Sequence, residues 1–249
     1  MIFDDKPSIV GHRGLGSGLQ GGYRENTVAS FLAAVGRGLS WVELDVHRSA
    51  DGQLMVCHDP VDATGQSIVT RTAADLAAEG VATLAEVLTA LPADVAVDVE
   101  IKSIIDDAVD PPAQRTHALV ADVLQQHRGT RRFFVSSFDP SAVVHLGGHR
   151  EAIGEAALGL IAGACLPPRH SIPAAANLGL DAVCLHTDSL SMTPERIIET
   201  AHLAGLEVMA WCPGPAEAVR LAAAGVDAVC VNDIPGVQVA LASAARSRG

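Results

Sequence analysis

Short runs of β-branched and apolar residues alternate with segments of helical period along the whole chain. Eight of these runs have the length and composition of buried strands: residues 9–10, 41–46, 95–101, 133–136, 158–162, 182–185, 207–211 and 228–231. A segment of helical period follows each of them, and no linker or change of composition interrupts the series. Eight strand–helix units in 249 residues predict an α/β protein, a single (β/α)8 barrel domain over residues 1–249.

The connection after the second strand departs from this alternation. Asp51-Gly52 is a turn signal that folds residues 54–57 back as a short ribbon, and residues 60–82 show no clear period. Thr83 and Glu86 then have the spacing of a capping box, which predicts that the next helix begins there. We therefore expect a short hairpin and an irregular stretch as an insertion after strand two.

The composition narrows the classes of partner. A formal net charge of −12 disfavours nucleic acid and anionic membranes. The N-terminus has no basic and apolar leader, and no apolar run is long enough to span a bilayer. Five cysteines without paired spacing favour a reducing compartment. The expectation is a cytoplasmic protein with no stable membrane anchor.

Acidic residues occupy alternate positions on two predicted strands. Glu43 and Asp45 share one face of the second strand, and Glu100 lies on the third strand with Asp98 at the same parity. Like charges inside a barrel are costly unless a cation neutralises them. An all-oxygen set of Glu43, Asp45 and Glu100 suits Mg²⁺ or Ca²⁺ better than zinc. The alternative is a structural ladder of ion pairs with Lys102.

Two histidines and two cations stand where strands end. His12 and His58 each follow a strand, and a pair of imidazoles can accept one proton while donating another. Arg13 and Lys102 supply the positive charge that a phosphate group requires. Trp211 ends strand seven, where it either forms the floor of a substrate pocket or packs in the core.

The remaining histidines receive structural interpretations. We expect His47 to support the rim of the site and His186 to line the pocket. The other six fall on predicted helices or loops and are interpreted as surface residues: His117, His127, His145, His149, His170 and His202.

A glycine-rich segment offers an alternative function. Residues 16–21 spell GxGxxG, and Glu43 and Asp45 lie about twenty residues on, as in NAD-dependent oxidoreductases. However, His12 and Arg13 separate these glycines from the strand, and residues 23–26 separate them from the helix. The segment therefore favours a flexible loop over the mouth of the barrel, with NAD binding as the alternative from another class.

The motifs, taken in order, resemble the glycerophosphodiester phosphodiesterase family (the GDPD domain). They run from residue 8 to residue 236 and are Gly-His12-Arg13-Gly, Glu25-Asn26-Thr27, Glu43-Leu-Asp45-Val, Asp51-Gly52, His58-Asp59, Glu100-Ile-Lys102, Ser137-Phe138, Trp211 and Gly225-Val-Asp227-Ala. The loop over residues 14–24 looks longer and richer in glycine than is usual in the family, and Arg24 stands where proline is common.

The resemblance implies a TIM barrel and a metal-dependent phosphoric diester hydrolase of glycerol and lipid metabolism. Its members hydrolyse glycerophosphodiesters to sn-glycerol 3-phosphate and an alcohol. By resemblance, one divalent cation, Mg²⁺ or Ca²⁺, is held by Glu43, Asp45 and Glu100. His12 and His58 are the general acid and base. In the route proposed for the family, the glycerol 2-hydroxyl attacks phosphorus, and water then opens the cyclic phosphate.

The same resemblance implies that Arg13, Lys102, Glu25 and Trp211 contact the substrate. The partner is then a small glycerophosphodiester, and the chain could form a homodimer. The alternative within the same fold is a lysophospholipase D or sphingomyelinase D. An aromatic content of 3% and the lack of a basic amphipathic helix argue against a lipid surface. A third alternative is a barrel without catalysis that serves as a binding scaffold.

Overall fold

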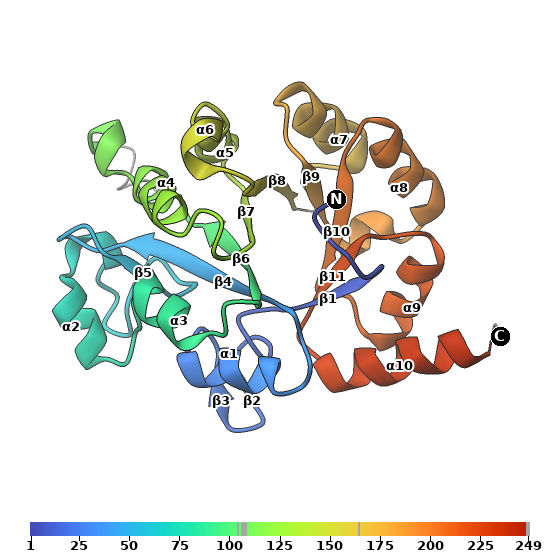
Figure 1. The fold of residues 1–249 in the computed structure, drawn as a ribbon, viewed down its shortest axis with the longest axis horizontal. Helices are drawn as coiled ribbons and strands as arrows, with labels where there is room; N and C mark the ends of the chain where they lie inside the picture. Colours follow the sequence, from blue (N-terminus) through green and yellow to red (C-terminus); the bar gives the residue numbers. More distant parts are fainter. Residues whose placement is uncertain (104, 106–108, 164, 248–249) are drawn as a thin grey trace.

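Eight parallel strands close into a barrel in the computed structural model, which describes residues 1–103, 105, 109–163 and 165–247 (Figure 1). The strands are β1 (Ser8–Gly11), β4 (Trp41–Arg48), β6 (Ala96–Ile101), β7 (Phe133–Ser137), β8 (Ala157–Ala162), β9 (Ala182–His186), β10 (Glu207–Trp211) and β11 (Ala228–Val231). They pair in chain order, and β1 pairs with both β4 and β11, so the sheet closes. The predicted (β/α)8 barrel is confirmed.

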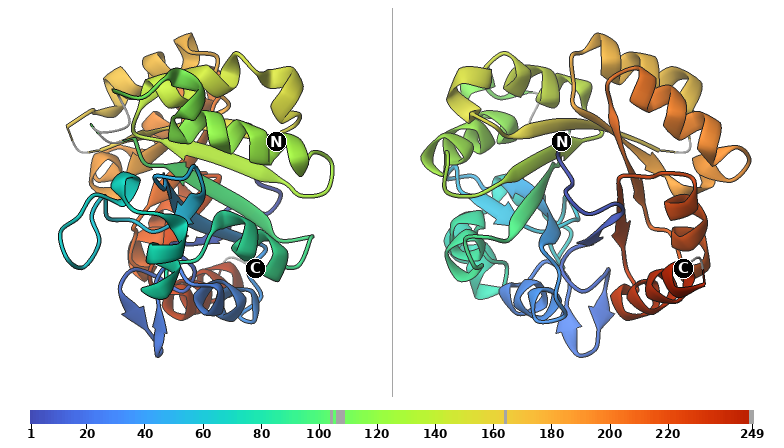
Figure 2. Two further views of the ribbon diagram at one scale, coloured as in Figure 1. Left: turned by 90° about the vertical axis from the view of Figure 1, so that its left-hand side faces the viewer. Right: turned by 45° about the vertical axis from the view of Figure 1, so that its right-hand side comes forward.

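Helices form a ring around the strands (Figures 1 and 2). They are α1 (Val28–Val35), α3 (Leu84–Ala90), α4 (Thr116–Gln126), α5 (Pro140–Gly147), α6 (Arg150–Ile153), α7 (Pro168–Asn177), α8 (Pro194–Leu203), α9 (Pro215–Ala223) and α10 (Ile234–Arg246), with single turns η3 (Pro112–Gln114) and η4 (Thr187–Leu190). Both bonds of the predicted capping box form: the Thr83 side chain accepts from the Glu86 N–H, and the Glu86 carboxylate accepts from the Thr83 N–H. None of the helices among the described residues is long and apolar enough to cross a bilayer.

The insertion after β4 contains more regular structure than the sequence predicts. β5 (Leu54–Val56) folds back antiparallel on the extension of β4, as expected from the turn at Asp51-Gly52. Residues 60–82, however, are not wholly irregular: they contain η1 (Ile68–Thr70) and the helix α2 (Ala73–Ala78). This helix has six residues and buries only Leu76, so it leaves no helical period in the sequence.

The glycine-rich segment also contains an unexpected element. β2 (Leu19–Gln20) and β3 (Tyr23–Arg24) form a small antiparallel hairpin, which projects from the body of the barrel (Figure 2). As the sequence predicts, the glycines do not open the next helix, because α1 begins at Val28 with Thr27 as its N-cap.

The core has two shells. The larger lies between the strands and the helices, and the smaller fills the barrel interior, where Phe3 closes the N-terminal end against Trp41 and Phe134. Phe134 is fully buried and lies across Gly159, where a Cβ atom would come within 2.3 Å of its ring. The interior is therefore packed solid below the mouth, and the chemistry is left to the C-terminal ends of the strands.

Candidate active site

Three carboxylates of β4 and β6 converge inside the barrel. The strand register places Asp45 beside Glu100 and Glu43 beside Asp98, all on the inner face. One oxygen from each of Glu43, Asp45 and Glu100 lies within 4.8 Å of the others, and all three side chains are buried. The parity argument from the sequence is confirmed, because residues 43, 45 and 100 do form one cluster.

The donor set of this cluster fits a hard divalent cation. All ligand atoms are carboxylate oxygens, and Glu43 Oε1 is buried without a hydrogen-bond partner. Burial, reinforced by the charges of Asp45 and Glu100, raises the pKa of Glu43 well above its usual range. Burial also raises the pKa of Glu100. A buried carboxylate cluster that resists ionisation in the absence of a cation is the environment that a bound cation would relieve.

Asp45 is the best-compensated member of the cluster. Lys102 Nζ lies 2.9 Å from its Oδ1, Arg13 Nε lies 3.3 Å from its Oδ2, and the Asn26 amide donates to Oδ2 at 2.8 Å. Burial raises the pKa of Asp45, but Lys102 and Arg13 outweigh it and hold that pKa below its ordinary value. Lys102 also pairs with Glu100. Both predicted phosphate-binding cations therefore border the carboxylates.

The backbone at the mouth is strained where these groups meet. Three non-glycine residues adopt positive φ, namely Arg13 at 51°, Asn26 at 54° and Cys212 at 61°, and all three contact the site. At Arg13 this turn directs the backbone N–H to Glu43 Oε2 at 2.8 Å, while the side chain pairs with Glu25 at 3.0 Å. Local strain thus directs both the amide and the guanidinium of Arg13 into one cluster.

The tautomer of His12 follows from its partners. Asn232 Oδ1 accepts the Ser17 N–H at 2.8 Å, which identifies that atom as the amide oxygen. His12 Nδ1 lies 2.7 Å from the same oxygen and must therefore donate to it, so in the neutral ring Nε2 carries the free lone pair. His12 Nε2 faces Glu43 at 4.0 Å. Asn232 directly follows the eighth predicted strand, but nothing in the sequence pairs it with a residue 220 positions away.

His58 lies on the other flank of the carboxylates. Its Nδ1 bonds to Asp59 at 2.8 Å, and its ring is partly exposed. A positive charge on this ring acts to lower the pKa of Glu100, against the effect of burial. His47 Nε2 donates to the backbone carbonyl of His58 at 3.1 Å, in keeping with the supporting place expected for His47 at the rim. Because burial lowers the pKa of His47, this supporting ring is neutral at pH 7.

Aromatic rings line the opposite side of the mouth. Trp211 contacts His186 at 4.3 Å and Phe138 at 5.9 Å between ring centroids, and Lys102 lies 6.0 Å from the Phe138 ring. Trp211 Nε1 is buried without an acceptor. The ring is half-buried at the end of β10, so it stands in the wall of the mouth and can donate a hydrogen bond to a ligand.

One expected surface histidine is in fact buried. His117 belongs to the apolar stripe of α4 together with Val120 and Leu124, at helical spacing, and packs toward the neighbouring helix. His127 and His145 are half-buried, whereas His149, His170 and His202 are exposed as predicted. Polarity alone thus misassigned His117, because an imidazole packs well when its nitrogens find partners.

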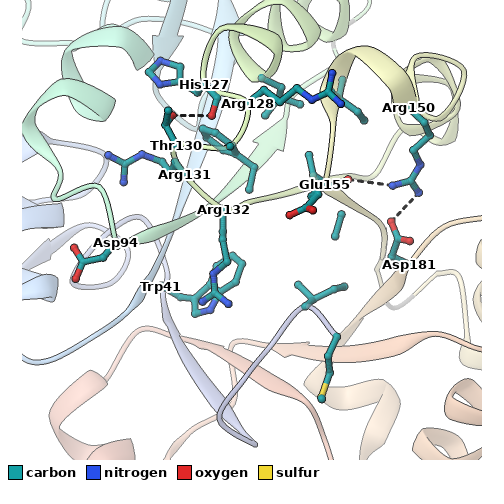
Figure 3. A pocket seen from close by; sticks show the side chains of 18 of the residues that line it. Trp41, Asp94, His127, Arg128, Thr130, Arg131, Arg132, Arg150, Glu155 and Asp181 are labelled. Atoms are coloured by element: carbon teal, nitrogen blue, oxygen red, sulfur yellow. Dashed lines mark hydrogen bonds and ion pairs between the residues drawn. The ribbon is translucent and has the colours of Figure 1, made fainter.

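Two cavities differ in their relation to this cluster. One of about 750 Å³ adjoins His58 and is lined by Glu25, Asn26 and the insertion after β4. The other, of about 790 Å³, opens at the N-terminal ends of the strands (Figure 3). Its lining balances four arginines against four acidic residues, and Arg150 bonds to Asp181 there. The second cavity lies at the wrong end of the barrel for the carboxylate cluster and carries no net side-chain charge.

The fold and part of the sequence are similar to those of known phosphodiesterases. Over 95% of this chain and 97% of the other, the fold matches an Oleispira antarctica phosphodiesterase solved in complex with the product sn-glycerol-3-phosphate (24% identity, TM-score 0.77). A Parabacteroides distasonis glycerophosphodiester phosphodiesterase matches over 97% and 99% (21% identity, TM-score 0.79). A glycerophosphocholine phosphodiesterase of Candida albicans is 47% identical over 55 residues, which are 20% of this chain and only 5% of that protein.

The sequence profile of one family extends over nearly the whole barrel. It matches residues 12–235, a span that begins at His12 and ends just after β11. The matched span includes every residue described above at the barrel mouth, from His12 to Asn232. The chain therefore belongs to the glycerophosphoryl diester phosphodiesterase family.

Proposed function

We propose that this protein hydrolyses glycerophosphodiesters to sn-glycerol 3-phosphate and an alcohol, with the aid of one divalent cation. The observation that carries the proposal is the convergence of Glu43, Asp45 and Glu100 beside Arg13 and Lys102, in a chain of this family. Three buried carboxylates suit a metal ion, and the two cationic side chains beside them suit a phosphate group bound at the same barrel mouth.

The metal ion and the two cationic side chains interact with different oxygens of the substrate phosphate. A bound Mg²⁺ or Ca²⁺ supplies Lewis-acid stabilisation of the charge that grows on the phosphoryl oxygens. Arg13 and Lys102, both fixed by Asp45, orient the remaining oxygens. Lys102 keeps its charge because Asp45 and Glu100 raise its pKa despite burial, which lowers it. These few positively charged groups thus allow a protein of negative net charge to bind an anionic substrate.

His12 acts as the first base and His58 as the first acid. His12 Nε2 takes the proton of the glycerol 2-hydroxyl as that oxygen bonds to phosphorus. The bond from phosphorus to the departing alcohol breaks, and protonated His58 gives its proton to that oxygen, with Asp59 holding Nδ1. In the second half water loses a proton to His58, its oxygen opens the cyclic phosphate, and His12 returns its proton to the glycerol oxygen.

The alternative functions gain less support. Residues 16–21 lie in a loop and hairpin, seven or more positions ahead of α1, whereas a dinucleotide site requires the helix to begin at the glycines. A lysophospholipase D would need room for an acyl chain, and the cavity beside His58 is bordered by Glu25, Asp59, Asp62 and Glu79. Val56, Val61, Ile68 and Val81 also line this cavity, but the four carboxylates favour a polar alcohol over an acyl chain.

The test is release of sn-glycerol 3-phosphate from glycerophosphocholine, glycerophosphoethanolamine and glycerophosphoglycerol, with Mg²⁺, with Ca²⁺ and with EDTA. We expect release that requires the cation and is lost in Glu43→Gln. The Arg196→Gln protein is a matched control, because Arg196 is exposed on α8. Cation-independent release would overturn the metal proposal, and release only from lysophosphatidylcholine would favour the lipid-directed alternative.

A further inference from the structure

Three of the ten histidines stack on the outside of the barrel, on the helices and not on the strands that carry the carboxylate cluster. His117 comes from α4, His145 from α5, and His149 from the turn that leads into α6. The ring centroids are 4.4 Å apart between His117 and His145 and 4.5 Å apart between His145 and His149. The row runs from the buried His117 to the exposed His149. It crosses the contact between α4 and α5, two neighbouring helices of the outer ring (Figure 1).

The local contacts favour the neutral, ligating form of His145 and His149. His149 Nδ1 lies 2.8 Å from the backbone carbonyl of His145, which can only accept, so Nδ1 carries the proton and Nε2 is free. A carbonyl bond of this kind fixes the ring orientation of many metal-bound histidines. Burial lowers the pKa of His145, as do His117 and His149, so that stacked rings do not all become charged.

We propose that His117, His145 and His149 form a binding site for a borderline divalent cation such as Zn²⁺, separate from the carboxylate site. Imidazole suits Zn²⁺, Ni²⁺ and Cu²⁺, whereas carboxylates suit Mg²⁺ and Ca²⁺, so the two donor sets select different ions. The bond from His149 Nδ1 to the backbone carbonyl of His145 holds the two side chains beside each other, which lets both reach one ion. The net charge of −12 attracts cations to the protein as a whole.

Binding requires a modest rearrangement of the rings. The planes of neighbouring rings are tilted by 48° and 33°, and the nitrogens do not yet converge on one point. Rotation about the terminal side-chain torsion of histidine is soft, so turning of the partly exposed His145 and the exposed His149 can bring their nitrogens toward one ion. The ion would then link α4 to α5, the helices on either side of β7, and would stabilise the outer ring of the barrel.

The experiment separates the two sites by their donor chemistry. Zn²⁺ is titrated calorimetrically into the metal-free protein with excess Mg²⁺ present, and Co²⁺ is used as a spectroscopic probe. We expect a Zn²⁺ site that survives in Glu43→Gln and visible Co²⁺ bands from nitrogen ligation. In His145→Gln and in His149→Gln the affinity should fall at least about tenfold, while His170→Gln, at an exposed histidine on α7, should match the wild type.

His149→Gln decides the matter if His145→Gln folds poorly, because His149 is exposed and its replacement leaves the core intact. Zn²⁺ affinity unchanged in His149→Gln would overturn the proposal. Zn²⁺ binding that disappears in Glu43→Gln would overturn it as well, since the ion would then belong to the carboxylates. The outcome does not depend on hydrolytic activity, so it stands apart from the proposed function.

Discussion

Two buried carboxylates at opposite ends of the barrel have contrasting surroundings. Asp227 precedes β11 at the N-terminal end, where it pairs with Lys6, lies 2.7 Å from His202 Nε2 and accepts the Val208 N–H at 2.7 Å. Glu43 is the third residue of β4, and its side chain reaches the residues that follow β1, where one oxygen accepts the Arg13 N–H and the other has no partner. Both side chains are essentially excluded from solvent.

The contrast separates a buried charge that is compensated within the fold from one that is compensated only in part. A buried carboxylate with all its oxygens satisfied stabilises the arrangement around it, and loss of one partner leaves the rest uncompensated. A buried carboxylate with an orphan oxygen and like charges beside it destabilises the protein until a cation arrives. Asp227 is of the first kind and Glu43 of the second, although both belong to motifs quoted from the sequence.

The largest expected effect is on catalysis in Glu43→Gln. Hydrolysis of a glycerophosphodiester should fall by about 10³-fold or more, because one ligand oxygen is lost where charge grows in the transition state. The metal-free variant should unfold at the same temperature as the wild type or higher, since an uncompensated charge has been removed. Steady-state kinetics and thermal unfolding in EDTA measure the two effects. A strongly destabilised variant would place Glu43 with Asp227 as a structural residue.

His12→Gln and His58→Gln should each reduce turnover by about 10²- to 10⁴-fold. The two variants should differ when the departing alcohol is a p-nitrophenol, which leaves without a proton. His58→Gln should then recover much of its activity and His12→Gln should not, because only the first base is still required. Equal recovery in both variants would contradict the assignment of His58 as first acid.

Asp227→Asn should show the reverse pattern of Glu43→Gln. The amide cannot compensate both Lys6 and His202, so the free energy of unfolding should fall by about 3 kcal/mol. The folded variant should keep the wild-type kcat, since residue 227 lies at the end of the barrel away from the carboxylate cluster. Denaturant unfolding and activity per folded molecule test this directly. A fall in kcat at full folding would break the distinction between the two ends.

The strands and the carboxylate cluster were predictable because both follow from periodicity. A strand has a period of two, so Glu43 and Asp45 had to share a face, and the parallel register then brought Glu100 alongside. Neither inference needed a distance. The same reasoning could not locate α2 or the β2–β3 hairpin, because elements of six and two residues bury too little apolar surface to leave a pattern.

The features that could not be predicted from the sequence depend on contacts between residues that are distant along the chain. The Asn232 amide fixes the tautomer of His12 through the closure of β1 against β11, and no local signal marks an asparagine for that purpose. The positive φ of Arg13 was equally hidden, since non-glycine residues adopt it only where surrounding contacts impose it. His117 was assigned to the surface from its polarity, whereas packing of α4 buried it. Tertiary context decided all three.

The smallest expected effect is a pH dependence of the gain in stability from Glu43→Gln, measured in EDTA. The ordinary pKa of a glutamate is 4.5, and burial followed by Asp45 and Glu100 raises that of Glu43 in the folded protein. Below 4.5 the side chain is neutral in both folded and unfolded chains, so the two proteins should differ little. As the pH rises, the unfolded chain ionises first and the wild type loses stability, at about 1.4 kcal/mol per unit of raised pKa. The gain should therefore grow with pH and level off above the folded pKa. Asp45, whose pKa is lowered, has the opposite dependence but is present in both proteins. A gain that shrinks with rising pH would mean that Glu43 is compensated as Asp227 is.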